Sequence, residues 1–352
     1  MYPAAADAEP TVVKISSPAD ILGVLPHRLG FHPTESLVMV CLEGPRRRDR
    51  LVMRVDLPAA RAERRFAREM ADRVRQTGAS GVVLVCYTDA SLAVGQQLAR
   101  ASAVATLKER LDADGIETVE ALLVRGGRWW SYLCTDERCC PSAGTPLSSE
   151  LTKAAGHYAA ESVAHGGVVL ADRATLVRSI EPPSNPVAEA VRDQAACAAG
   201  ELLVTVIERD GVEAAGRLAV STLRRLAAAW SDGARELTPE DAALIALGLR
   251  DRAARDLATT LVLDHDEGVV VALLTDIVRC VDDINAAPVS TVLAWVAYVE
   301  GGGALAAVAA ERALRCEPGY AMAELVLDGL SRMVTSREIR EVTEQVRADL
   351  EG

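Results

Sequence analysis

The chain has 352 residues, half of them hydrophobic, which excludes a disordered protein and favours two domains over one. Only 3% of the residues are aromatic, so Leu, Val and Ala must fill the cores, and this composition favours closely packed helices. The formal net charge of −12 repels phosphate backbones unless basic residues cluster on one face. The one dense basic run, Arg46 to Arg48 with Arg50, is interrupted by Asp49, and we interpret it as a solvated hairpin tip.

The N-terminus lacks the basic and hydrophobic regions of a signal peptide, and no segment reaches the roughly 18 consecutive apolar residues that cross a membrane. Several of the eight cysteines lie inside apolar runs, as small buried residues do in a reducing compartment. We therefore expect a cytoplasmic protein that binds neither nucleic acid nor membranes.

The first elements in chain order are short. Three of the four residues 12–15 are β-branched and predict a strand, and Ser17 followed by Pro18 predicts the start of a helix. Pro26 predicts that this helix ends near Leu25. Two strands are expected next, one in the continuous apolar run 36–42 and one in the alternating run 51–57, and together they predict a hairpin.

Strands and helices then alternate. Helical spacing predicts helices at 59–76 and 91–112, and apolar runs predict strands at 81–87 and 118–124. The pair Gly126-Gly127 predicts a tight hairpin turn into a further strand. With two more helices predicted at 148–164 and 172–180, residues 1–180 are expected to form a three-layer α/β domain with a mixed sheet.

Three prolines in residues 181–186 predict a linker, and almost everything beyond it has helical periodicity. Helices are expected at 187–209, 212–230, 239–263, 268–283, 289–300, 303–316, 319–333 and 336–350. Residues 187–352 should therefore form an all-helical domain. Small or apolar residues and a closing proline match the tetratricopeptide pattern at Leu293, Ala294, Ala306, Ala313 and Pro318. We expect one tetratricopeptide-like hairpin there, whose groove would bind a protein partner.

The stretch LPHRLGFHPTESLV places two histidines before a buried strand. His27 and His32 are about 140° apart on a helix, and Gly30 and Pro33 interrupt that helix, so this is no helical metal motif such as H-E-x-x-H. Two interpretations remain open. The stretch is either a structural connection or a ligand-binding loop, and in the second case the ligand-binding residues are His27, Arg28, His32 and Ser36.

Only Cys134, Cys139 and Cys140 form a cysteine cluster. These three thiolates could hold a zinc ion, with His157 or His165 as the fourth ligand. The spacing is not C-x-x-C, however, so a partly buried thiol loop and a reactive thiol remain alternatives.

Common catalytic motifs are missing from the sequence. It contains no GxxxxGK[ST] loop, no GxGxxG after a strand and no GxSxG elbow. Whether the protein is an enzyme therefore stays open, and no cofactor is indicated.

Two stretches, LPHRLGFHPTESLV and SYLCTDERCCPSAGTPL, resemble the signatures LGFxPxxS and CCPxxG of an uncharacterised actinobacterial family, a domain of unknown function. The segment ALAAVAAERALRCEPGYAMAELV is similar to the helical tail of that family, so the resemblance spans most of the chain. It implies a source among high-GC bacteria and implies no activity.

The leading hypothesis is a binding or regulatory protein whose helical half contacts a protein partner, with a possible small-ligand loop at residues 27–36. The alternative is a thiol- or zinc-dependent enzyme or metal protein centred on Cys134, Cys139 and Cys140.

Overall fold

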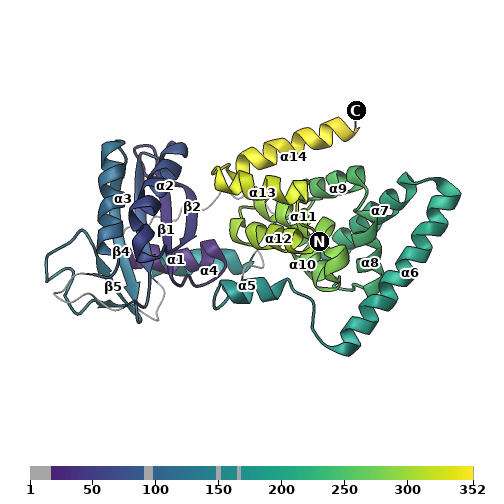
Figure 1. The fold of residues 1–352 in the computed structure, drawn as a ribbon, viewed down its shortest axis with the longest axis horizontal. Helices are drawn as coiled ribbons and strands as arrows, with labels where there is room; N and C mark the ends of the chain where they lie inside the picture. The colour runs from purple at the N-terminus through teal and green to yellow at the C-terminus, as the bar shows by residue number, and fades with distance from the viewer. Residues whose placement is uncertain (1–16, 91–97, 148–151, 165–167, 352) are drawn as a thin grey trace, which may run out of the picture. The chain divides into compact units, whose positions relative to one another are not determined.

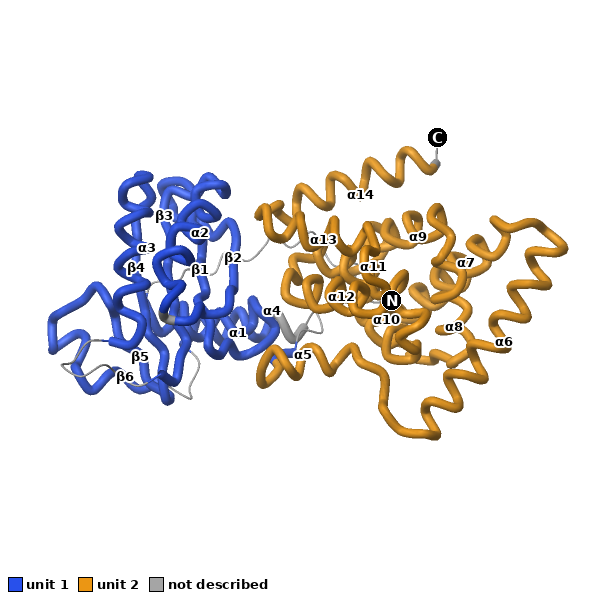
Figure 2. The backbone as a smooth tube through the Cα atoms, viewed as in Figure 1, with its two compact units in different colours: residues 1–169 blue, residues 170–352 orange. Residues whose placement is uncertain are grey.

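A computed structural model describes residues 17–90, 98–147, 152–164 and 168–351. The chain divides into two compact units, residues 1–169 and residues 170–352 (Figure 2). The strand predicted at 12–15 and the first part of the helix predicted at 91–112 lie outside the described residues. Among the described helices, none has the length and apolar character needed to cross a membrane.

The first unit is built on a six-stranded sheet with the order β2-β1-β3-β4-β5-β6, whose strands are labelled in Figure 1 and Figure 2. Its strands are β1 (Ser36–Glu43), β2 (Arg48–Asp56), β3 (Gly81–Tyr87), β4 (Glu117–Arg125), β5 (Arg128–Ser131) and β6 (Thr145–Pro146). Strands β3 and β4 are parallel, and every other neighbouring pair is antiparallel. The prediction of a mixed α/β sheet is confirmed.

Both faces of the sheet centre are covered, because all of β3 and residues 36–42 of β1 are buried. On one face, Leu37 and Cys86 of the sheet lie beside Phe66 of α2 (Glu63–Gln76) and Val104 of α3 (Ala101–Ala113). Helices α1 (Pro18–Leu29) and α4 (Lys153–Ala164) pack against each other in the same unit.

Helix α1 begins as predicted and ends later than predicted. Ser17 Oγ accepts the N–H of Asp20 at 3.2 Å, and the Asp20 carboxylate accepts the N–H of Ser17 at 3.0 Å, which closes a capping box. The predicted end near residue 25 is wrong, because the helix continues through Pro26 to Leu29. Burial of Pro26 and Leu29 offsets the backbone hydrogen bond that a proline cannot donate. The helix stops at Gly30, whose φ of +76° is left-handed.

The second unit is helical, as predicted. It contains α5 (Arg173–Ser179), α6 (Pro186–Asp210), α7 (Glu213–Ser231), α8 (Pro239–Gly248), α9 (Arg252–Thr259), the 3₁₀ turn η2 (Thr260–Leu263), α10 (Val269–Arg279), α11 (Asp283–Val299), α12 (Gly303–Cys316), α13 (Ala321–Ser331) and α14 (Ser336–Glu351). Helix α5 contacts α12, where Arg173 pairs with Glu311 at 2.7 Å. The domain limits 1–180 and 187–352 stay a proposal, since the compact units divide between Val169 and Leu170.

Two helix boundaries differ from those predicted. The single helix predicted at 239–263 is wrong, because α8 ends at Gly248 and Asp251 accepts the N–H of Ala254 at 2.8 Å as the N-cap of a separate helix, α9. Helix α11 begins before Pro288 rather than after it, and this proline lies within the first turns of the helix. At both places the sequence contains a residue that can cap or break a helix. Whether it does so depends on tertiary packing, which the sequence alone does not show.

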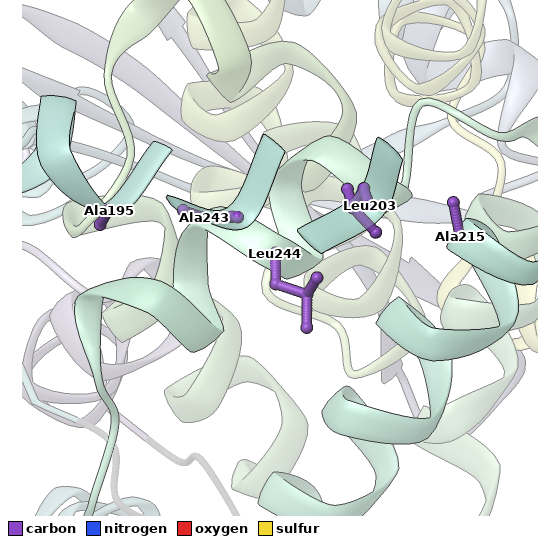
Figure 3. Close-up of a cluster of buried hydrophobic side chains, with 6 residues drawn as sticks. Ala195, Leu203, Ala215, Ala243 and Leu244 are labelled. Carbon is purple, nitrogen blue, oxygen red and sulfur yellow. The ribbon is translucent and has the colours of Figure 1, made fainter. Parts of the chain in front are cut away.

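Alanine and leucine side chains build the core, as the composition predicts. One buried cluster joins α6, α7 and α8 (Figure 3) and consists of Ala195, Ala199, Leu203, Ala215, Ala243 and Leu244. Helix α11 is enclosed beyond its first turn, because every residue from 286 to 299 is buried. Helices α11 and α12 do pack closely, but the buried surface of α11 leaves no open face there for a partner. The tetratricopeptide likeness therefore stays a prediction.

A fully buried arginine joins several helix ends in this unit. Arg312 on α12 donates hydrogen bonds to the backbone carbonyls of Ile180, Val278 at 3.0 Å and Val281 at 3.1 Å. It also lies 3.4 Å from the carboxylate of Asp283. The guanidinium thus supplies donors to the carbonyls of Ile180 and Val281, which follow α5 and α10, and adds one to the Val278 carbonyl, which also accepts the backbone N–H of Val281.

We expect Arg312→Met to destabilise the protein by about 2 kcal/mol or more, since the buried carbonyls of Ile180 and Val281 lose their donor at roughly 1–3 kcal/mol each. Arg315→Met, one turn further along α12, is the matched control, because that side chain is half-exposed and pairs with Glu181 at the surface. Urea unfolding of both variants measures the difference. Equal midpoints for the two variants would show that the buried guanidinium of Arg312 stabilises the protein no more than the surface guanidinium of Arg315.

Candidate functional site

The loop between β5 and β6 carries the cysteine cluster, and the end of β5 fixes where this loop starts. Ser131 Oγ donates to the carboxylate of Glu120 on β4 at 2.8 Å. The same oxygen accepts the backbone N–H groups of Leu133 and Cys134, each at 3.1 Å. Cys134 is therefore held beside the sheet by a side chain of the last β5 residue.

A turn at Asp136 brings the other two cysteines back toward Cys134. The Asp136 carbonyl accepts the N–H of Cys139 at 3.0 Å and the N–H of Cys140 at 2.7 Å. The Asp136 carboxylate accepts the N–H of Arg138 at 2.9 Å and also pairs with its guanidinium. As a result, the three sulfur atoms all lie within 4.8 Å of one another, and the Sγ atoms of Cys139 and Cys140 are 3.9 Å apart.

The far side of the loop rests on a tryptophan. Trp130 Nε1 donates to the carbonyl of Ser142 at 3.0 Å, and Arg128 donates to the carbonyl of Gly144 at 2.6 Å. Gly144 has a φ of +75°, and a Cβ at this position would lie 2.4 Å from Trp130 Cε2. Both the conformation and the close approach require glycine. Trp130 is thus a support for the cysteine loop.

The three thiols are chemically unequal. A hydrogen bond from the backbone N–H of Asp136 holds the pKa of the Cys134 thiol below its ordinary value, and a hydrogen bond from Cys140 lowers it further. Burial raises the pKa of the Cys140 thiol to about 12, and the neighbouring thiols add to this rise. A bound cation would favour the thiolate form of all three.

The proposed fourth ligand is not part of this cluster. Among the described residues, no histidine, aspartate or glutamate places a ligand atom within this group of three sulfurs. His157, which is exposed, therefore lies outside the site. His165 falls outside the described residues. Within the described part of the chain, the site therefore offers three sulfur ligands and leaves any further position open.

The four predicted ligand-binding residues are distributed along the connection from α1 to β1. His27 and Arg28 lie in the last turn of α1, His32 is exposed in the connection, and Ser36 is the fully buried first residue of β1. The Arg28 guanidinium pairs with Asp49 at 3.1 Å. Burial lowers the pKa of His27, and the charge of His32 lowers it further. These contacts support the structural interpretation of the stretch.

Glu35 is the residue that the sequence interpretation missed. Its carboxylate accepts the hydroxyl of Thr88 at 2.9 Å and the N–H of Asp89 at 2.7 Å, which ties the start of β1 to the end of β3. Its φ of +39° is unusual for a residue with a side chain. No local signal could identify it, because its partners lie more than fifty residues away in the sequence.

One observation keeps the ligand-binding hypothesis open. Ser36 Oγ and Tyr87 Oη are buried without a hydrogen-bond partner among the described residues, and these two residues are paired across β1 and β3. Buried hydroxyls normally have a partner, so a small polar molecule at this end of the inner strands β1 and β3 is compatible with the structure. A ligand site at Ser36 stays a prediction.

We expect Gly144→Ala to destabilise the protein more than Gly127→Ala. Gly127 has a similar φ of +71° but has open space around the added methyl, so its substitution should cost only the left-handed backbone penalty of roughly 1–2 kcal/mol. At Gly144 the methyl also displaces Trp130. Urea unfolding followed by tryptophan fluorescence compares the two, and indistinguishable midpoints would contradict the supporting role of Trp130.

Comparison with known proteins identifies the family. The matching family model is described as "Domain of unknown function (DUF4192)", and it covers residues 18–336. No curated protein and no solved structure matches the chain significantly. The matched region includes the histidine stretch, the cysteine loop and most of the helical unit. The resemblance to an uncharacterised family is thereby confirmed, and the chain belongs to the family of the domain of unknown function DUF4192.

Proposed function

We propose that this protein binds a thiophilic metal ion, with Zn²⁺ as the first candidate, through Cys134, Cys139 and Cys140. The observation that carries the proposal is the distance of at most 4.8 Å between any two of the three sulfurs. Zn–S bonds of about 2.3 Å in a tetrahedral site place thiolates about 3.8 Å apart. The 3.9 Å between Cys139 and Cys140 is close to this value, and the cluster needs only a small contraction.

The surroundings of the loop support the proposal. Hydrogen bonds to Ser131, Asp136 and Trp130 hold the loop at both ends, so ligand binding would not have to order it. Cys139 is exposed, which lets an ion reach the sulfurs from solvent. Because thiols must lose protons to bind metal, the affinity should fall as the pH is lowered.

Three protein ligands would give the ion an open coordination position. Structural zinc sites usually have four protein ligands, whereas sites that keep a place for water or substrate usually have three. The donor set found among the described residues is of the second kind. It therefore supports the thiol- or zinc-dependent enzyme as well as the simpler metal-binding protein, and the ion's chemistry would be that of a Lewis acid.

We expect the purified protein, prepared without chelator and loaded with Zn²⁺, to retain about one ion per chain through dialysis, as a single three-thiolate site requires. The Cys139→Ser and Cys140→Ser double variant should retain none, because one sulfur cannot hold the ion. Elemental analysis by mass spectrometry measures this.

The control is Cys197→Ser, which removes an exposed cysteine on α6 and should leave zinc binding unchanged. Circular dichroism checks that the double variant is folded. If wild-type protein retains no more zinc than the folded double variant, the cluster is not a metal site.

A second candidate function is binding of a protein partner by the helical unit. Helix α6 supports it, because this helix exposes apolar side chains: Val187 at 75%, Val191 at 44%, Leu202 at 48% and Val204 at 54%. Exposed apolar residues on one element are typical of protein interfaces.

We expect the Val191→Asp and Leu202→Asp double variant of the full chain to lose any protein that wild type recovers in a pull-down, because charged side chains resist desolvation in an interface. The Glu189→Gln and Glu201→Gln pair on the same helix is the control. Recovery by the aspartate variant equal to that of wild type would remove α6 as the partner surface.

A further inference from the structure

A row of arginines lies on the outer side of α2. Arg61, in the 3₁₀ turn η1 (Ala60–Ala62), is followed in α2 by Arg64, Arg65 and Arg68, and this spacing keeps the three α2 residues within about 100° of one another around the helix. We call these four residues the arginine face. All are exposed, while the apolar residues of the helix are buried inside the first unit.

The acidic residues of α2 are engaged elsewhere. Glu63 pairs with Arg100 at 3.0 Å, Glu69 pairs with Arg73 at 3.1 Å, and Asp72 pairs with Arg75 at 2.8 Å. Within the described part of the chain, none of the four arginines has an ion pair or a side-chain hydrogen bond of its own. The helix therefore presents a band of positive charge that no carboxylate of the described residues neutralises.

The negative net charge of the chain is not located in the unit that carries the arginine face. Residues 1–169 contain equal numbers of basic and acidic residues, so the whole net charge of −12 belongs to residues 170–352. Our expectation that the protein avoids nucleic acid rested on the charge of the complete chain. For the first unit, that argument does not hold.

We propose that the arginine face binds the phosphate backbone of a nucleic acid. A guanidinium donates two parallel hydrogen bonds to a phosphate, and it stays charged at any physiological pH. Seven residues of helix span about 10.5 Å, which is enough to contact several successive phosphates of one strand, spaced about 3.4 Å along the axis. Phe66, the one aromatic residue of α2, is partly buried beneath the helix, so backbone contact without base reading is expected.

A membrane surface fits these observations less well. Helices that lie in a membrane interface insert an apolar face between the lipids, and here Ala67, Met70 and Val74 are already buried in the first unit. Only the electrostatic part of such binding would remain. Anionic vesicles therefore serve as the competing occupant in the test.

The test uses the full-length protein and fluorescence polarisation with a labelled 20-base-pair DNA duplex and a labelled 20-nucleotide RNA. If the four arginines each contact a phosphate of the duplex, the affinity should fall about 100-fold between 50 and 200 mM salt. The Arg64→Glu and Arg68→Glu double variant should bind at least tenfold more weakly. The control is Arg46→Glu with Arg48→Glu at the β1–β2 turn, which reverses the same number of exposed arginines in the same unit.

An Arg64→Gln and Arg68→Gln double variant repeats the test without adding negative charges that would repel phosphate. Thermal melting confirms that each variant is folded. Loss of binding in the α2 variants with little loss in the β1–β2 turn control supports the proposal. Equal losses in both pairs, no binding by wild type, or binding to anionic vesicles in place of nucleic acid would each overturn it. Added EDTA should change nothing, which separates this surface from the cysteine site.

Discussion

Close contact between small side chains sets how the helices pack in both units. In the first unit, a Cβ on Gly23 of α1 would lie 2.6 Å from the Ala155 Cβ of α4. In the second, a Cβ on Gly248 of α8 would lie 2.3 Å from the Ala219 Cβ of α7. With few aromatic side chains to fill wide gaps, helix backbones have to approach closely, and only glycine and alanine permit that approach. The alanine-rich composition is thus a packing requirement.

Dense helix packing leaves many helix ends without water, and polar side chains compensate. The buried Arg312 supplies donors to carbonyls at two such ends. Arg192 of α6 similarly joins the carbonyl of Pro183 at 3.0 Å and the carboxylate of Asp282. Both arginines hold segments from different parts of the second unit together, so the apolar core and its polar connections depend on each other.

The cysteine loop and the arginine face of the first unit differ in how their side chains are arranged. The cysteine loop is held by hydrogen bonds from residues of β5 and from its own turn, and its sulfurs converge on one point. The arginine face is spread along a helix and has no ion pair within the described ranges, because the carboxylates of α2 pair with other cations. A soft-metal site and an anion-binding surface can coexist in one unit, since the first depends on short sulfur distances and the second on unneutralised charge.

The sequence by itself determined the order and type of nearly all described elements, because the signals are local. The cap at Ser17, the turn at Gly126-Gly127 and the run of β1 each depend on neighbouring residues. The cysteine cluster was also visible, since its members lie within seven residues, although only the turn at Asp136 shows that the sulfurs converge.

Only the tertiary structure decided features that depend on residues distant in the sequence. The course of α1 through Pro26 depends on burial, and the role of Glu35 depends on its contact with Thr88. The exclusion of His157 from the cysteine site likewise required knowing where α4 lies. Whether an arginine on α2 is paired depends on which cations have already taken the nearby carboxylates. Spacing along the chain specifies a face or a turn, but contacts between faces are fixed only when the chain is folded.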